Sequence, residues 1–162
     1  MLRGAADRPV IYLLRNAVRG WNHGIFPIRD ARWALAEIRR RHQGRPIVLI
    51  GHSMGGRVGI AVLTEPAVIG LVGLAPWLPR GEPIPELDGR RVVLLHGSAD
   101  TQISPADTRA WVQRAAQQAT GQHTESVEYQ EIPGGDHPMI RRFRQFSRLS
   151  GLAVHSMLPG LR

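Results

Sequence analysis

A serine flanked by glycines is the first feature of this sequence that could do chemistry. Gly51-His52-Ser53-Met54-Gly55 matches the pattern Gly-x-Ser-x-Gly. It follows the apolar run Ile47–Ile50, which predicts a strand, and precedes a segment that predicts a helix over roughly Gly55–Leu63. At a sharp turn from strand to helix, the serine hydroxyl is exposed above the sheet as a nucleophile. The backbone N–H of Met54, at the start of the helix, would then point toward a developing oxyanion.

The glycines around Ser53 predict a tight turn, and they also allow two other interpretations. We expect Gly51 and Gly55 to avoid collisions in the turn, and Gly56 to permit close packing of the helix on the strand. A glycine-rich turn can, however, carry a serine that has no chemical role. The spacing from Gly51 to Gly56 also fits the start of a phosphate-binding loop, but the next two residues are Arg and Val. That loop requires Lys and then Ser or Thr, so nucleotide binding is not expected.

A serine nucleophile needs a base, and the base needs an acid that orients it. On a parallel sheet the expected chain order is serine, acid, histidine. Asp100 comes shortly after a predicted strand, Val92–Leu95, and therefore lies beyond a carboxyl end of the sheet. His137 follows another predicted strand, Val127–Ile132, through a glycine-rich loop. We predict Asp100 as the acid and His137 as the base. The alternatives are that Asp100 only stabilises an Asx turn and that His137 is an exposed loop residue.

Other acids and histidines compete for these two roles. Asp107 is better explained as part of a helix capping box, and Asp88 precedes its strand and so lies at the wrong edge. His52 flanks the nucleophile but is expected to point elsewhere, and His96 is expected to pack in the interior or brace a loop. The other histidines lie outside the expected position: His23, His42, His123 and His155.

Segments of alternating type surround these residues. Further strands are predicted at Val10–Leu14 and Val68–Leu74. Helices are predicted over Ile28–His42, from Pro105 to about Thr120, and over about Pro138–Met157. For the second of these helices, Ser104 is the expected N-cap and Gly121 ends the helix. Prolines predict a loop over Pro76–Pro79 and Gly81–Pro85. The alternation predicts an α/β fold, a three-layer sandwich in which helices cover both faces of a mainly parallel sheet.

Composition excludes several classes of protein. The 162 residues predict a single domain, 1–162, without a separate lid domain. No Cys is present, which excludes disulfides, Cys-bound zinc and thiol catalysis, and no His-Glu-x-x-His cluster suggests another metal. We therefore predict no metal and no cofactor. No apolar run approaches the length of a membrane span, so a cytoplasmic location is the default expectation.

The charge is strongly basic. The net charge is +8, and all 21 basic residues are Arg. Such a charge is compatible with binding to nucleic acid or to an anionic lipid surface. Aromatic residues make up only 6% of the chain and do not interleave with the arginine runs, as a base-stacking surface would require. Nucleic-acid binding is therefore not expected, and a codon bias toward Arg is the simpler explanation.

The three motifs together resemble the α/β-hydrolase superfamily. They are Gly-His-Ser-Met-Gly-Gly, His-Gly-Ser-Ala-Asp and Gly-Gly-Asp-His, and the resemblance covers roughly residues 10–157. The chain is most similar to the small lidless esterase and dienelactone-hydrolase type, although Ser53 stands where dienelactone hydrolases carry Cys. The resemblance implies Ser53 as nucleophile, Asp100 as acid, His137 as base and the Met54 N–H as one oxyanion donor.

The sequence departs from this family at its N-terminus. Family members carry about three more strands ahead, and the loop after the third supplies a second oxyanion N–H. Here Val10–Leu14 looks like the fourth strand, and only nine residues precede it. We therefore expect an N-terminally shortened hydrolase. The missing third strand should leave a gap or force re-pairing, and the exposed edge could support a homodimer.

The expected function is hydrolysis of a small-molecule carboxylic ester or thioester through an acyl-enzyme on Ser53. Its pocket could be lined by four apolar residues, for which plain core packing is the alternative: Trp77, Leu78, Ile103 and Trp21. A second hypothesis is a catalytically weak, hydrolase-like protein that binds a ligand or partner, because the N-terminal oxyanion region is missing. A third is an arginine-driven interaction with nucleic acid or anionic lipid.

Overall fold

A four-stranded parallel sheet forms the centre of the molecule. The structure, a computed structural model, describes residues 9–87, 89–118 and 127–158. The strand order is β1-β2-β3-β4, and all three neighbouring pairs are parallel. The strands are β1 (Ile47–His52), β2 (Val68–Leu74), β3 (Arg91–Gly97) and β4 (Val127–Ile132). The helices are the short η2 (Asn22–Gly24), α1 (Ile25–Arg41), α2 (Met54–Ala61), α3 (Pro105–Gln118) and α4 (Phe143–Met157).

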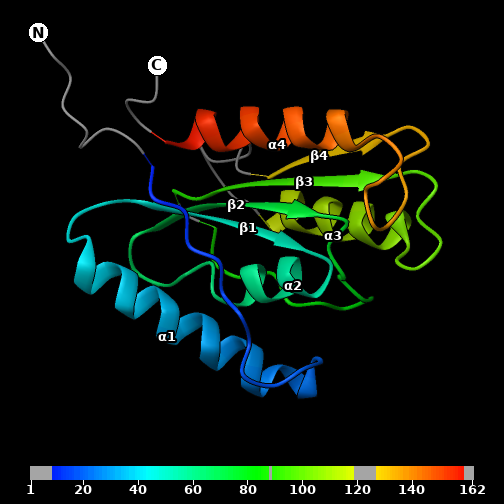
Figure 1. Cartoon of the computed structure of the whole chain (residues 1–162). Coiled ribbons are helices and arrows are strands. Elements are labelled where there is room, and N and C mark those ends of the chain that lie inside the picture. The colour runs from blue at the N-terminus through cyan, green and yellow to red at the C-terminus, as the bar shows by residue number, and fades with distance from the viewer. Residues whose placement is uncertain (1–8, 88, 119–126, 159–162) are drawn as a thin grey trace, which may run out of the picture.

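Side chains of the sheet alternate between two hydrophobic cores. Leu71 and Leu94 face one core, which α1, α2 and α3 complete with residues such as Leu35 and Trp111. Their chain neighbours face a second core, which α4 closes with Phe146, Ala153 and Met157. Figure 1 shows α4 above the sheet and α1 and α2 below it. This arrangement confirms the predicted three-layer α/β fold, because helices cover both faces of a parallel sheet.

The helix boundaries differ from the sequence-based ones where backbone geometry decides. α1 begins at Ile25, three residues before the predicted start, because Pro27 is tolerated in a first turn and Gly24 before it has a φ of 81°. α4 begins at Phe143 rather than near Pro138, because Met139 and Arg142 have φ values of 59° and 97°, which a helix does not allow. The predicted end of the third helix, Thr120 and Gly121, lies outside the described residues.

The predicted strand Val10–Leu14 is wrong. This segment has no regular secondary structure, and Ile11 and Leu13 are 90% and 97% exposed. Its described contacts include a hydrogen bond between the Tyr12 hydroxyl and His42 Nε2, at 2.7 Å. An apolar run becomes a strand only where a neighbouring strand takes its N–H and C=O groups. The segment does not pair with β1, so the expected gap, rather than re-pairing, is what the structure has.

β1 consequently lies at one end of the described sheet. β2 is its partner on one side, and on the other side no strand of the described ranges is bonded to it. Ile50, in the middle of β1, is 59% exposed. An edge strand of this kind presents unpaired backbone groups. A homodimer through this edge stays a prediction.

Candidate active site

Ser53 occupies a strained turn between β1 and α2. Its φ of 52° and ψ of −117° are unfavourable for a residue with a side chain. Four backbone hydrogen bonds hold it there. The Ser53 N–H donates to the Leu74 carbonyl at 2.9 Å. The Ser53 carbonyl accepts the N–H groups of Gly56 and Trp77, each at 3.0 Å, and that of Arg57 at 3.4 Å. The end of β2 therefore fixes the conformation of the turn that carries the hydroxyl.

Only two of the three glycines near Ser53 are required by close packing. A Cβ on Gly51 would lie 2.3 Å from the carbonyl oxygen of Gly55. A Cβ on Gly56 would lie 2.7 Å from Pro76 Cβ, so Gly56 packs on the loop after β2. A Cβ on Gly55 would meet nothing within 4 Å, and the expectation that this glycine avoids a collision is wrong. It is the backbone of Gly55, not the space beside its Cα, that crowds Gly51.

These two glycines of one motif should respond very differently to a methyl group. We expect Gly51→Ala to cost about 3–5 kcal/mol of unfolding free energy or to prevent folding, because the clash is with backbone. Gly55→Ala should change it by less than about 1 kcal/mol, since alanine favours the helix. Urea unfolding of both variants measures the difference. Equal stability of the two would show that the turn is looser than these contacts require.

His137 lies within hydrogen-bond distance of both Ser53 and Asp100. The Ser53 hydroxyl is 3.0 Å from His137 Nε2, and His137 Nδ1 is 2.8 Å from Asp100 Oδ2. Asp100 and His137 are 7% and 9% exposed. Each of the three residues follows the carboxyl end of a strand, β1, β3 or β4, where the arrowheads point in Figure 1. The convergence that the sequence predicted is therefore present.

The loops that carry Asp100 and His137 are bonded to each other. The Ala99 N–H donates to the Gly135 carbonyl at 2.9 Å, and the Ser98 N–H donates to the Ile132 carbonyl at 3.0 Å. The Gly134 N–H returns a bond to Ser98 Oγ at 2.9 Å. A Cβ on Gly97 would lie 2.2 Å from the Gly135 carbonyl oxygen, so glycine is needed for this approach. These hydrogen bonds between the loops hold the Asp100 carboxylate and the His137 imidazole in fixed positions relative to each other.

The environment of Asp100 keeps its carboxylate ionised. Its Oδ1 accepts the backbone N–H groups of Gln102 and Ile103, both at 2.9 Å. Burial by itself would raise the pKa of Asp100, but the Ile103 N–H, His137 and the Gln102 N–H together outweigh it, and the pKa lies below its ordinary value. An ionised carboxylate only accepts hydrogen bonds, so His137 donates through Nδ1–H. Nε2 is then free to accept the proton of Ser53.

Two further histidines contact this group, and sequence reasoning did not find their partners. His52 was expected to point away from this group, and that expectation is wrong. Its Nε2–H donates to the His137 carbonyl at 2.8 Å, and the centres of the two rings lie 4.9 Å apart. His96 is fully buried, as predicted, and its Nε2 lies 3.0 Å from Asp100 Oδ2. His96 and Asp100 are the first and last residues of the motif His-Gly-Ser-Ala-Asp, but the motif alone did not indicate that their side chains meet, because the contact depends on how the turn after β3 folds back.

Met54 stands where an oxyanion donor is expected. It is the first residue of α2, directly after Ser53. The first N–H groups of a helix have no acceptor within the helix, and they favour negative charge. The Met54 N–H therefore remains the proposed oxyanion donor next to the hydroxyl.

The four residues suggested as a substrate surface divide into two groups. Leu78 is 1% exposed and packs in the core with α1, α2 and α3, so it offers no surface to a substrate. Trp21, Trp77 and Ile103 are half-buried. The two indoles contact each other edge to face, with ring centres 5.8 Å apart, and the guanidinium of Arg57 lies over both, 4.0 Å from the Trp21 ring centre and 4.6 Å from that of Trp77. This cluster connects the segment before α1 to the loop after β2, whose Trp77 N–H donates to the Ser53 carbonyl.

Arg57 also carries an ion pair whose loss should be costly. Its Nη2 lies 2.6 Å from Glu82 Oε2, and both side chains are largely buried. We expect Arg57→Met to cost about 3–5 kcal/mol of unfolding free energy, because it leaves a buried carboxylate unpaired. The double variant with Glu82→Gln should recover much of that loss. Urea unfolding provides the measurement, and a double variant less stable than Arg57→Met would contradict this assignment.

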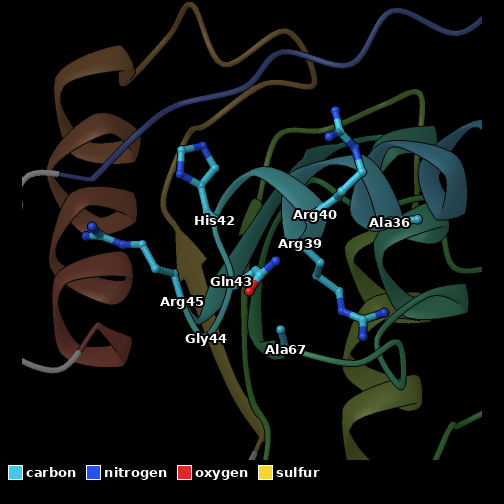
Figure 2. Close-up of a pocket in the computed structure, with 8 residues that line it drawn as sticks. All are labelled: Ala36, Arg39, Arg40, His42, Gln43, Gly44, Arg45 and Ala67. Atoms are coloured by element: carbon cyan, nitrogen blue, oxygen red, sulfur yellow. The ribbon is translucent and has the colours of Figure 1, made fainter.

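A basic hollow lies at the other end of the sheet. It has a volume of about 430 Å³ and adjoins the end of α1 and the amino ends of β1 and β2. Figure 2 shows Arg39, Arg40 and Arg45 around it, pointing in different directions rather than toward one centre. Arg40 is also paired with Glu37 at 2.8 Å. The arginines thus provide no focused anion site at this hollow.

The remaining candidates from the sequence lie elsewhere. Asp107 is on α3, 3.8 Å from Arg80, and Asp88 and His123 lie outside the described residues. Among the described residues no group of three or more His, Asp or Glu side chains is arranged to hold a metal ion. No helix in residues 9–87, 89–118 or 127–158 has both the length and the apolar character to cross a membrane.

Comparison with known proteins identifies the fold of the chain. The family model described as serine aminopeptidase S33 matches residues 18–92, which is less than half of the chain. No curated protein matches. Similar solved structures include an α/β hydrolase from Agrobacterium tumefaciens whose function is unknown, with 18% identity and a TM-score of 0.70 over 90% of this chain and 70% of that one.

Two other solved structures have similar scores. A serine hydrolase homologue from Coxiella burnetii is 18% identical, with a TM-score of 0.65 over 86% of this chain and 62% of that one. A serine hydrolase without a lid from Xanthomonas campestris is 19% identical, with a TM-score of 0.67 over 89% and 62%. The chain thus spans 62–70% of the length of these three structures. It has the α/β-hydrolase fold, which the sequence motifs predicted.

Proposed function

We propose that this protein is a serine hydrolase that cleaves small carboxylic esters or thioesters through an acyl-enzyme on Ser53. The observation that carries the proposal is the continuous set of contacts from the Ser53 hydroxyl to His137 and from His137 to Asp100, at 3.0 Å and 2.8 Å. These three residues constitute the nucleophile, base and acid of acyl transfer. The α/β-hydrolase fold and the serine hydrolases among its neighbours agree with this chemistry.

The first half-reaction forms the acyl-enzyme. Ser53 Oγ attacks the substrate carbonyl carbon while its proton passes to His137 Nε2. The carbonyl oxygen becomes an oxyanion, which the Met54 N–H stabilises. Collapse breaks the bond to the alcohol or thiol, and the imidazolium returns its proton to that leaving group. Asp100 stays ionised throughout and stabilises the imidazolium through Nδ1–H.

The second half-reaction regenerates Ser53. A water molecule gives a proton to His137 Nε2 and attacks the acyl carbon. Collapse then breaks the bond to Ser53 Oγ, which recovers the proton from His137. We propose that this occurs in one lidless domain, with Trp21, Trp77 and Ile103 as the apolar groups nearest to an acyl chain. No cofactor takes part in these steps.

The alternative is a hydrolase-like protein with weak activity that binds a ligand or partner. Its motive is the unpaired side of β1, where the family's third strand and its oxyanion loop are expected. The loss of one oxyanion donor costs about 3–4 kcal/mol of transition-state stabilisation, some hundred- to thousandfold in rate. This alternative keeps the same three residues but predicts little turnover.

A panel of chromogenic substrates tests the proposed function. The purified protein is incubated with p-nitrophenyl esters of acetate, butyrate and octanoate, an acyl thioester, and an amino-acid p-nitroanilide. We expect turnover of the esters and the thioester well above the rate in buffer. Turnover of the anilide alone would replace the proposed ester specificity by an amidase one. A folded protein that is inert toward all of them would favour the binding alternative.

A further inference from the structure

His96 is a buried titratable residue that the proposed reaction does not use. It lies next to the end of β3, and its ring is completely inaccessible to solvent. Nε2 is 3.0 Å from Asp100 Oδ2, and Nδ1 is 2.9 Å from the hydroxyl of Thr108 on α3. Both ring nitrogens therefore have a partner, and one of them is the predicted acid.

The partners of His96 determine its tautomer. Asp100 Oδ2 can only accept, so His96 Nε2 carries the hydrogen, and Nδ1 accepts the hydroxyl hydrogen of Thr108. The carbonyl of Pro76 is 3.5 Å from the same hydroxyl, a longer contact that competes poorly with the one at 2.9 Å. A second hydrogen on the ring would leave two donors facing each other between His96 and Thr108.

Electrostatics agrees with a neutral ring. Burial lowers the pKa of His96, and it outweighs the hydrogen bond and charge of Asp100, which raise it. The titratable groups that face the ring are Asp100 and, beyond it, His137. His96 therefore stays uncharged at neutral pH and acts on the carboxylate as a hydrogen-bond donor rather than as a cation.

Asp100 Oδ2 thus receives two imidazole N–H groups, while Oδ1 receives two backbone N–H groups. Four donors fix the position and plane of a carboxylate more closely than the His137 contact could alone. The second donor on Oδ2 also draws charge away from the bond to His137.

We propose that His96 is a positioning residue for this reaction: through Nε2–H it fixes the position and plane of the Asp100 carboxylate that orients His137. The inference rests on the proposed roles of Ser53, Asp100 and His137. It assigns to a buried histidine at the end of β3 an effect on the rate of hydrolysis.

A matched pair of amide substitutions tests the inference. In His96→Gln the side-chain N–H₂ can reach the position of the imidazole Nε2 and Asp100. In His96→Asn the shorter amide reaches only the position of Nδ1 and Thr108. Both side chains are neutral and smaller than imidazole, so a purely structural role would affect both. Circular dichroism and urea unfolding establish that each variant is folded.

The expected results separate kcat from KM. His96→Gln should keep kcat within about threefold of the wild type, because the donor remains. His96→Asn should lose about tenfold or more in kcat at unchanged KM, because the acid is misplaced. Equal losses of kcat in both variants, or a loss in His96→Asn that appears in KM instead of kcat, would overturn the inference.

Nuclear magnetic resonance of the wild-type protein provides a readout that needs no turnover. With ¹⁵N-labelled histidine, His96 should be neutral at pH 7, with hydrogen on Nε2 and a lone pair on Nδ1. Hydrogen on Nδ1, or on both nitrogens, would overturn the inference even if a variant fails to fold. A folded wild-type protein without hydrolysis would refute the proposed function but would leave the role of His96 open to a second test. The Nδ1 proton of His137, bonded to Asp100, should give a far-downfield proton resonance. This resonance should be kept in His96→Gln and lost in His96→Asn.

Discussion

Ser53→Ala should abolish hydrolysis while leaving the protein folded. We expect kcat to fall by at least about 10⁴-fold, because no other group can form the acyl-enzyme in this position. The backbone turn is held by the N–H and carbonyl of Ser53 rather than by its hydroxyl, so alanine should preserve it. Steady-state hydrolysis of a p-nitrophenyl ester, with circular dichroism on the same sample, measures both effects.

A second serine serves as the control for this substitution. Ser147 is exposed on α4 and takes no part in the contacts that join Ser53, His137 and Asp100, so Ser147→Ala should retain wild-type kcat and KM. If Ser53→Ala kept more than about a tenth of the wild-type kcat, the nucleophile would have to be another residue.

Asp100→Asn should be nearly as severe, for a reason that lies in its hydrogen bonds. Oδ1 accepts two backbone N–H groups, so the amide oxygen of asparagine must occupy that side. The amide N–H₂ then takes the place of Oδ2 and faces Nδ1 of His137 and Nε2 of His96. His137 must offer a lone pair at Nδ1 and carry its hydrogen on Nε2. In that tautomer it cannot accept the Ser53 proton.

We therefore expect Asp100→Asn to lose about 10³–10⁴-fold in kcat with little change in KM. Asp107→Asn, at a half-buried aspartate in the first turn of α3, is the matched control and should leave both constants unchanged. The initial rate of ester hydrolysis between pH 6 and pH 9 gives the comparison. A loss of less than about tenfold would show that Asp100 is not what orients the base.

The part of the fold that follows Ile47 was predictable because its signals are local. The first three strands from Ile47 onward are apolar runs, and the fourth, Val127–Ile132, mixes apolar and polar residues. Gly or Pro follows each strand within one or two residues, and each proposed catalytic residue comes shortly after one of these strands. The rule that carboxyl ends of parallel strands share one edge then brings Ser53, Asp100 and His137 together. No long-range contact has to be known in advance for that inference.

The errors arose where a residue's state depends on a distant neighbour. Val10–Leu14 has the composition of a strand, but strand formation requires a partner that the described sheet does not supply. Leu78 lies in a loop as predicted, but it packs in the core, the stated alternative to its suggested place in a substrate pocket. His96 was expected to pack in the interior or brace a loop, and the identity of its partner depends on how the turn from Gly97 to Asp100 folds back.

The central claim is that Ser53 forms a covalent bond with the acyl group. A fluorophosphonate transfers its phosphonyl group to an activated serine, and digestion followed by mass spectrometry locates the adduct. We predict one adduct per chain, on the peptide that contains Ser53, and none after His137→Gln, because the hydroxyl then has no base. A folded wild-type protein that remains unmodified, or that carries the adduct on another residue, would contradict the account.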